Sequence, residues 1–221
     1  MNFWVRHNRK LINMAEIKLI NKHWITGYDM VIEPLAKFLI NLRVHPDVIT
    51  FTGFLLSILA FNFFRQGAFF FGGVMVILAG TCDRLDGRLA RDTNRSSKFG
   101  ALIDSTIDRY SEVLVFLGLA IFFHDKYGYI VYLIILAITG SFMVSYTRAR
   151  AEGLGLECKV GLMQRSERIT YLAIGTLLGS IPKIGILIVI ITLWFIAILA
   201  NVTVIQRVVH IRNQLKKQEN V

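Results

Sequence analysis

Six apolar segments, separated by short polar stretches, dominate the sequence and set its fold class. They run over about residues 47–64, 68–82, 101–123, 127–146, 169–181 and 184–209. A helix needs about 20 mainly apolar residues to cross a bilayer, where it satisfies its own backbone hydrogen bonds. The chain is 54% hydrophobic. The sequence therefore predicts an all-α integral membrane protein with six transmembrane helices, the second and fifth of which continue past their short apolar runs.

The first 45 residues differ from the rest and are predicted to lie along the membrane surface. Residues 1–24 lack the continuous apolar run of a cleaved signal peptide. Ile12, Ile17 and Ile20 are interspersed with basic residues, a pattern that favours an N-terminal interfacial amphipathic helix over a solvated basic arm. Residues 30–43 form a second amphipathic segment. We expect an interfacial segment (1–45), a six-helix membrane domain (46–212) and a cytoplasmic tail (213–221).

The basic residues are distributed unevenly and predict the orientation in the membrane. Six spans leave three loops on one side, near Arg65, Lys126 and Lys183, with three of the 25 Lys and Arg residues. Because cytoplasmic loops are rich in basic residues, the N-terminus, the 82–100 and 147–168 loops and the C-terminus are assigned to the cytoplasm. The net charge of +10 thus suits anionic headgroups and phosphorylated substrates at the cell membrane. A chain without a soluble domain is a poor candidate for nucleic-acid binding.

The two cysteines, Cys82 and Cys158, are both assigned to this cytoplasmic side, where thiols stay reduced. Neither belongs to a Cys-x-x-Cys pair, and no histidine lies at zinc-ligand spacing. We interpret both as small packing residues.

The most informative polar stretch is DRLDGRLARDTNRSSKFGALIDSTID, residues 83–108. Asp83 and Asp86 are three residues apart and Asp104 and Asp108 are four apart, so each pair shares one helix face. The polar stretch between them predicts a helical hairpin that brings the four carboxylates together. Clustered carboxylates repel one another and need cations. All-oxygen ligands favour Mg²⁺ or Mn²⁺. A hairpin neutralised by its own arginines is the alternative.

Small residues beside the aspartates strengthen the functional interpretation. Gly87 and Ala90 follow Asp86 on the first helix, and Gly100 precedes Asp104 by four residues. A glycine within a helix costs about 1 kcal/mol relative to alanine, which indicates that something approaches the backbone closely. A flat nucleotide base and a closely packed helix both fit this requirement.

The pattern Asp83-x-x-Asp86-Gly87-x-x-Ala90-Arg91, followed after eight residues by Gly100-x-x-x-Asp104-x-x-x-Asp108, resembles the signature of the CDP-alcohol phosphotransferases. The resemblance covers most of the chain from about residue 46 onward. It implies a homodimer of six-helix protomers with a polar cavity open to the cytoplasm. It also implies the transfer of a substituted phosphoryl group from a CDP-linked lipid to an alcohol, with release of CMP.

The same resemblance implies roles for individual residues. Asp83, Asp86 and Asp104 would be the principal ligands of two Mg²⁺ or Mn²⁺ ions. Asp108 would take the proton of the acceptor hydroxyl and also contact metal. The donor would be bound by Asp83, Gly87, Ala90, Arg91 and Gly100, with Gly87 and Ala90 leaving room for cytidine and Arg91 pairing with phosphate.

A second basic cluster points to the acceptor alcohol. It consists of Arg148, Arg150, Lys159, Arg165 and Arg168, and Arg207 or Arg212 of the last helix is a further candidate. Arg165 and Arg168 are three residues apart and can converge on one anion. The segment resembles the phosphatidylinositol-phosphate synthase branch, which implies inositol phosphate as acceptor. Phosphatidylglycerophosphate synthases, an archaeal-type donor lipid, and simple positive-inside topology are the alternatives.

Two other classes of membrane protein carry intramembrane carboxylates. Intramembrane prenyltransferases also use aspartate-rich motifs, Mg²⁺ and pyrophosphate donors, but their motifs lie on helices far apart in sequence. Ion transporters show internal repeats and charges near the membrane midplane. This sequence has neither a repeat nor midplane carboxylates, so an ion transporter is a distant alternative to an enzyme.

Overall fold

The structure is a computed structural model that describes residues 22–219, and within this range it is all-helical. The helices are α2 (Lys22–Asn41), α3 (Pro46–Arg65), α4 (Phe69–Asp92), α5 (Lys98–Lys126), α6 (Tyr129–Gly153), α7 (Arg165–Leu178) and α8 (Gly185–Glu219). Each of α3 to α8 coincides with one predicted apolar segment. The surface helix expected within residues 1–24 falls almost entirely outside the described residues.

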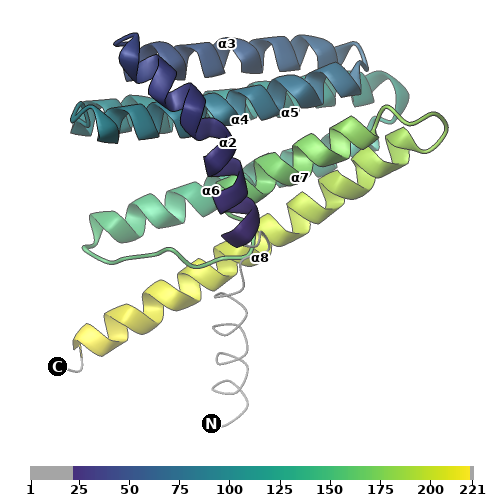
Figure 1. Ribbon diagram of the computed structural model, residues 1–221. Helices are drawn as coiled ribbons and strands as arrows, with labels where there is room; N and C mark the ends of the chain where they lie inside the picture. Colours follow the sequence, from purple (N-terminus) through teal and green to yellow (C-terminus); the bar gives the residue numbers. More distant parts are fainter. Residues whose placement is uncertain (1–21, 220–221) are drawn as a thin grey trace.

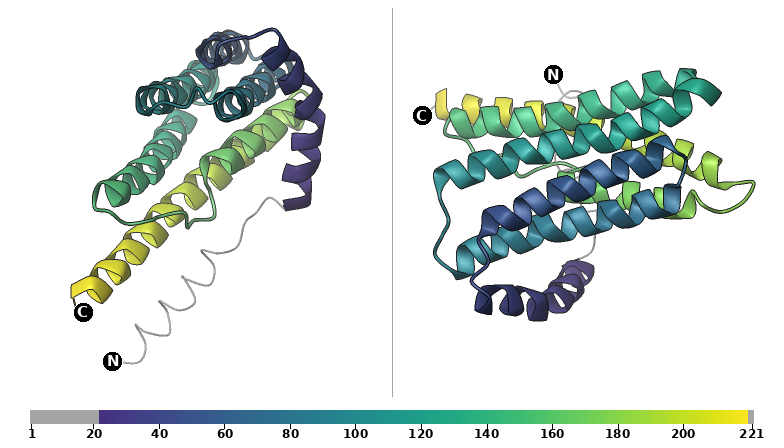
Figure 2. Two further views of the ribbon diagram at one scale, coloured as in Figure 1. Left: turned by 60° about the vertical axis from the view of Figure 1, so that its left-hand side comes forward. Right: turned by 90° about the horizontal axis from the view of Figure 1, so that it is seen from above.

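The six helices α3 to α8 lie side by side, and each runs antiparallel to the helix before it in the sequence (Figures 1 and 2). The α3–α4, α5–α6 and α7–α8 turns lie at one end of the bundle, on the right of Figure 1. The α4–α5 turn, the α6–α7 loop and the C-terminus lie at the other end. Helix α2 runs across the bundle, and it is longer than the amphipathic segment predicted for residues 30–43.

Three of the described helices, α3, α6 and α8, are long and apolar enough to cross a membrane by length and composition. Helices α4 and α5 are long but carry the charged motif in one half. Helix α7 has 14 residues, about 21 Å at 1.5 Å per residue, which is shorter than the hydrocarbon core of about 30 Å. The chain is thus an all-α membrane protein, and the full count of six spans stays a prediction.

The main hydrophobic cluster of the described residues lies between helices α3 to α8. It includes Phe64 of α3, Phe69 of α4, and Phe116 and Phe123 of α5, all of which are buried. Small residues bring α3 close to both partners. A Cβ on Gly118 would lie 2.6 Å from the Phe61 carbonyl oxygen, and one on Gly53 would lie 3.1 Å from the Cβ of Cys82. The motif-bearing helices α4 and α5 therefore pack tightly on α3.

The α6–α7 loop, residues 154–164, is fastened to α8. The backbone N–H groups of Leu162 and Met163 donate to Gln206 Oε1 at 3.3 Å and Thr203 Oγ1 at 2.9 Å. Arg207 donates through Nε to the carbonyl of Val160 at 2.9 Å. These bonds fix the start of α7. Helix α8 itself continues to Glu219, so most of the expected tail (213–221) extends this helix.

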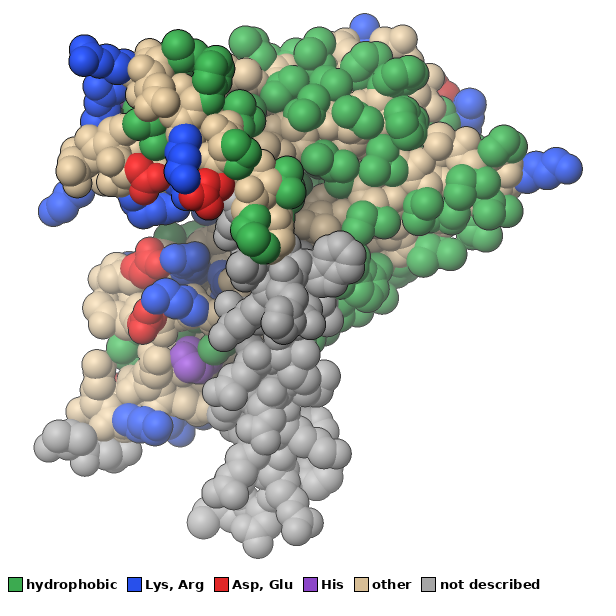
Figure 3. All heavy atoms as spheres, in the orientation of Figure 1, with side chains coloured by type: hydrophobic (Ala, Val, Ile, Leu, Met, Phe, Trp, Pro, Cys, Tyr) green, Lys and Arg blue, Asp and Glu red, His purple; other side chains and the backbone are tan. Residues whose placement is uncertain are grey.

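Charged side chains gather at one end of the molecule (Figure 3). On the face shown, Lys, Arg, Asp and Glu side chains are concentrated at the end that carries the α4–α5 turn and the C-terminus, and hydrophobic side chains cover the middle. Both cysteines are free. Cys158 is buried against Ala151 and Leu156, and Cys82 faces Gly53, as expected of packing residues.

Candidate active site

The α4–α5 hairpin positions the four aspartates. Helix α4 carries Asp83 and Asp86 near its C-terminal end, and α5 carries Asp104 and Asp108 near its start. Ser97 caps α5, because its hydroxyl accepts a hydrogen bond from the Gly100 N–H at 2.9 Å. The predicted hairpin is confirmed, and Gly100 takes part in it through its backbone.

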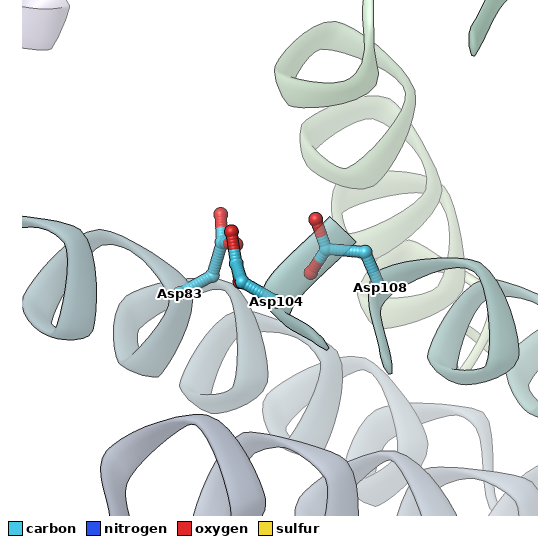
Figure 4. Close-up of side chains that lie close together, drawn as sticks. All are labelled: Asp83, Asp104 and Asp108. Atoms are coloured by element: carbon cyan, nitrogen blue, oxygen red, sulfur yellow. The ribbon is translucent and has the colours of Figure 1, made fainter. Parts of the chain in front are cut away.

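Three of the aspartates meet (Figure 4). Carboxylate oxygens of Asp83, Asp104 and Asp108 lie within 4.8 Å of one another, and in Figure 4 the side chains extend from two helices into one space. One oxygen of Asp104, Oδ1, is buried and has no hydrogen-bond partner among the described residues. Such a set of oxygen atoms suits a hard divalent cation.

The fourth aspartate, Asp86, is held differently. Its Oδ2 accepts a hydrogen bond from Thr50 Oγ1 at 2.6 Å, and its Oδ1 accepts one from the Gly87 N–H at 2.5 Å. Asp86 is only 5% exposed. It borders the same small cavity as the other three aspartates, but it lies outside the group of three whose oxygens meet.

An arginine of α7, Arg165, contacts two of the carboxylates. Arg165 Nη1 lies 2.8 Å from Asp83 Oδ1 and Arg165 Nη2 lies 2.5 Å from Asp108 Oδ1. Arg109, next in sequence to Asp108, is 3.8 Å from Asp108 Oδ2. Arg165 thus joins the aspartates on α4 to those on α5.

Arg84 and Arg88 of α4 make their contacts away from the carboxylate group. The Arg84 guanidinium lies over the Tyr28 ring of α2, 5.3 Å from its centroid. Arg88 pairs with Asp92 at 3.4 Å and approaches Glu33 at 3.9 Å. The Arg84–Tyr28 and Arg88–Glu33 contacts help to dock α2 on α4.

Three cavities surround Asp83. The first, of about 60 Å³, lies between α3, α4, α5 and α7 and is lined by the aspartates, Arg165 and Arg168. The second, of about 280 Å³, lies between α4 and α7 and is mainly apolar. The third, of about 570 Å³, is lined by Gly87, Arg91 and other residues of α4 and by Ile32 of α2.

The basic residues expected at the acceptor pocket occupy different environments. Arg148 pairs with Glu152 at 2.9 Å and both are about half exposed; Arg150 is exposed. Arg207 is 2% exposed and donates to the Val144 and Val160 carbonyls. Arg165 reaches the aspartates, so the structure brings only this member of the basic cluster into the carboxylate group.

Lys159 lies in the α6–α7 loop and pairs with Glu157. A hydrogen bond from the Lys159 ammonium to the Glu157 carboxylate holds the pKa of Glu157 below its usual value. Both side chains are largely exposed, so this pair belongs to the surface of the loop.

Comparison with known proteins decides the family. The sequence model of the family described as CDP-alcohol phosphatidyltransferase matches residues 43–211. The chain belongs to this family. It is therefore a membrane-embedded transferase. The resemblance inferred from the eight fixed positions within residues 83–108 is confirmed.

Relatives within the CDP-alcohol phosphatidyltransferase family include enzymes of bacterial and archaeal lipid synthesis. The phosphatidylinositol phosphate synthase of Streptomyces avermitilis is 33% identical over 204 residues, which cover 89% of this chain and 84% of that protein. The archaetidylinositol phosphate synthase of Pyrococcus horikoshii is 36% identical over 187 residues, which cover 84% and 93%.

Solved structures of the same family agree with this fold. The crystal structure of Mycobacterium tuberculosis phosphatidylinositol phosphate synthase with CDP-DAG bound matches with a TM-score of 0.73 at 31% identity, covering 80% of this chain and 92% of that one. Its complex with manganese and citrate matches with a TM-score of 0.72 at 30% identity, covering 80% and 87%.

Sequence reasoning missed two residues near the centre of this transferase. Thr50 of α3 holds Asp86, and no sequence pattern links the two because they are 36 residues apart. Glu112 of α5 binds Arg168. Its position four residues after Asp108 was a usable signal, because it places Glu112 on the aspartate face of the helix.

Proposed function

We propose that this chain transfers a phosphatidyl-type group from a CDP-linked lipid to inositol phosphate and releases CMP. The observation that carries the proposal is the meeting of Asp83, Asp104, Asp108 and Arg165 beside a cavity between membrane helices. Relatives named phosphatidylinositol phosphate synthase and archaetidylinositol phosphate synthase support a phosphorylated inositol as the acceptor.

Two Mg²⁺ or Mn²⁺ ions would be held by Asp83, Asp104 and Asp108, together with Asp86, which borders the same cavity. Their oxygen-only ligand set fits these ions, and the buried, unpartnered Asp104 Oδ1 is available to a cation. The manganese complex of the M. tuberculosis enzyme supports the assignment. Such ions neutralise a pyrophosphate and the CMP that leaves it.

The donor's cytidine would lie in the cavity of about 570 Å³ on the outer side of α4. Gly87 and Arg91 line this cavity, and an added Cβ on Gly87 would come within 3.4 Å of Arg91 Nη1. The lack of a side chain at Gly87, and the short one at Ala90, leave room for a base. Arg91 is exposed and free to turn toward phosphate.

The acceptor phosphate would be bound by the basic cluster at the same end of the bundle. Arg165 is suited to this role because its side chain is 26% exposed and its buried Nε has no hydrogen-bond partner in the described part of the chain. Arg148 and Arg150 are exposed at the end of α6. Lys159 of the α6–α7 loop and Arg207 of α8, which donates to the loop carbonyl of Val160, would add positive charge.

In the reaction, Asp108 would accept the proton of the acceptor hydroxyl. The hydroxyl oxygen forms a bond to the β-phosphorus of the donor as the bond from that phosphorus to CMP breaks, so CMP leaves with the electron pair. Arg165, held between Asp83 and Asp108, offers positive charge next to the base. Positioning of the reactants supplies much of the rate in such a transfer.

The active end of the bundle would face the cytoplasm of the cell membrane, with α2 at the interface. The concentration of basic residues at this end supports the orientation. In this arrangement, the lipid tails of the donor stay in the bilayer while the acceptor arrives from water. The proposal includes a homodimer, as the family resemblance implies.

CMP release by the purified protein tests the function. The protein is offered CDP-diacylglycerol or its archaeal isoprenoid equivalent with Mg²⁺ or Mn²⁺, and inositol phosphate, glycerol 3-phosphate, inositol and serine are supplied separately. We expect CMP with inositol phosphate and none after chelation of the metal. Folded protein that releases no CMP with any acceptor contradicts transferase activity on these substrates. CMP release with glycerol 3-phosphate alone would show that the acceptor is glycerol 3-phosphate and not inositol phosphate.

A further inference from the structure

A buried ion pair lies one helical turn beyond the candidate site. Arg168 of α7 forms a two-point contact with Glu112 of α5, with Nε 2.8 Å from Oε1 and Nη2 3.1 Å from Oε2. The two side chains are only 2% and 9% exposed. The third guanidinium nitrogen, Nη1, donates to the Met163 carbonyl at 3.3 Å. Every nitrogen of Arg168 therefore has a protein partner.

This pair continues a contact that belongs to the site itself. Glu112 follows Asp108 by one turn on α5, and Arg168 follows Arg165 by nearly one turn on α7. Asp108–Arg165 and Glu112–Arg168 are thus two successive bridges between the same two helices. The first bridge borders the reacting groups, and the second is closed off from solvent.

The two bridges matter because α5 and α7 have other main packing partners. Helix α7 packs mainly on α4 and α8, and α5 packs mainly on α3 and α6. The small cavity lies in the space between them. Long arginine side chains cross this space, so the position of α7 relative to the Asp108 carboxylate depends on them.

Arg168 is poorly suited to bind the acceptor phosphate, the role expected for it from sequence. A phosphate would have to displace Glu112, which would leave a buried carboxylate without its partner, a costly outcome. Arg165 is less constrained, because its Nε is unpartnered in the described structure and its side chain is 26% exposed. The two arginines therefore have separate tasks.

We propose that Glu112 and Arg168 are positioning residues that fix α7 on α5, so that the Arg165 guanidinium stays between Asp83 and Asp108. Neither residue contacts substrate. This role rests on the proposed function, because it assigns the pair to the transfer reaction at that site. The two-point geometry of the pair sets both the distance and the rotation of α7.

The double variant Glu112→Leu/Arg168→Met tests the role. Replacing both partners of a buried ion pair by apolar residues of similar volume commonly preserves stability, so the variant is expected to fold. We expect kcat to fall about 100-fold, the cost of misplacing a reacting group by about 1 Å, with KM for inositol phosphate within about threefold of the wild type. Lys37→Gln, which removes an exposed ion pair on α2 but leaves the Arg88–Glu33 contact in place, is the control and should keep kcat within about twofold.

A distance measurement tests the positioning independently of turnover. Spin labels are placed at Leu117 of α5 and Ile174 of α7, two exposed positions, in protein with both native cysteines replaced by alanine. We expect one narrow distance distribution, which shifts or broadens in the double variant. An unchanged distribution overturns the proposal even if the wild type proves inactive toward every acceptor.

Two kinetic results contradict the proposal. Unchanged kcat in the folded double variant shows that the pair does not act on the reaction. A raised KM for the acceptor at unchanged kcat assigns Arg168 to the phosphate. If the double variant does not fold, Arg168→Lys replaces it, since lysine keeps the charge but loses the two-point contact. For Arg168→Lys we expect kcat about 10-fold lower at unchanged KM, and an unaltered kcat overturns the role.

Discussion

Asp108 shows how much one residue's function depends on its neighbours. It lies between Arg165 at 2.5 Å and the oxygens of Asp83 and Asp104. An arginine keeps its charge at every accessible pH, so Asp108 always has a cation beside it. A metal ion that binds Asp83 and Asp108 shares both carboxylates with Arg165. In the proposed function, the bridging arginine and the divalent ions would therefore bind the same two carboxylates.

Replacing Asp108 with asparagine keeps the side-chain shape but removes the proton acceptor. We expect CMP release to fall by about 10²–10⁴-fold, the usual contribution of a general base, while binding of the CDP-linked lipid is retained. Turnover and lipid binding are measured on the same preparation. Asp125→Asn, at an exposed position at the other end of the bundle, is the matched control. If Asp108→Asn leaves turnover unaltered, Asp108 is not the base.

At the scale of elements, the α6–α7 loop decides where α7 begins. Hydrogen bonds to Thr203, Gln206 and Arg207 hold it along α8. Gly161 lies in this loop with φ +131°, where other residues are strained. A Cβ there would be 2.3 Å from Thr203 Cγ2. The close contact fixes the distance between the loop and α8, and with it the start of the helix that carries Arg165.

Gly161→Ala is therefore expected to destabilise the protein and reduce turnover. Gly155→Ala is the control, because Gly155 also has a positive φ, +73°, but no atom lies within 4 Å of the position that its Cβ would take. Backbone strain alone costs about 1–2 kcal/mol, and Gly161→Ala adds the clash with Thr203. The measurement is thermal unfolding in detergent, with CMP release as a second readout. Equal losses in the two variants would mean that the contact with α8 is unimportant.

At the scale of the whole molecule, charge and apolar surface are separated along the bundle axis. The aspartate cluster, Arg165 and the exposed arginines at the end of α6 share one end (Figures 1 and 3). The middle of the molecule exposes large apolar side chains, among them Leu117, Ile135, Leu187 and Ile191. A bilayer accommodates such a surface. The reacting groups then lie at the depth of the lipid headgroups.

Accessibility of single cysteines tests the orientation. In protein with Cys82 and Cys158 replaced by alanine, Ser96→Cys marks the α4–α5 turn and Ser180→Cys the α7–α8 turn; both serines are exposed. We expect a membrane-impermeant maleimide to label only Ser180→Cys in intact cells, and both after lysis. Labelling of Ser96→Cys alone in intact cells reverses the orientation. Labelling of both excludes the arrangement of turns on opposite sides.

Much of this protein was predictable from local sequence patterns. The six helices α3 to α8 follow the apolar segments, and α3, α6 and α8 are long and apolar enough to cross a membrane, where a helix satisfies its own backbone hydrogen bonds. The hairpin that pairs Asp83 with Asp104 and Asp108 follows from helical spacing over 26 residues. The direction of Arg84 and Arg88 away from the carboxylates follows from the same spacing.

Contacts between distant segments were not predictable, because no periodicity connects them. Thr50 of α3 donates a hydrogen bond to Asp86, which lies outside the group of three carboxylates that meet. Arg165 and Arg168 look alike in sequence, yet one bridges the aspartates and the other is buried against Glu112. The sequence by itself determined the membrane helices, the aspartate motif and the family. Only the tertiary structure decided which charges meet, because an ion pair depends on how the helices pack and on how far each side chain reaches.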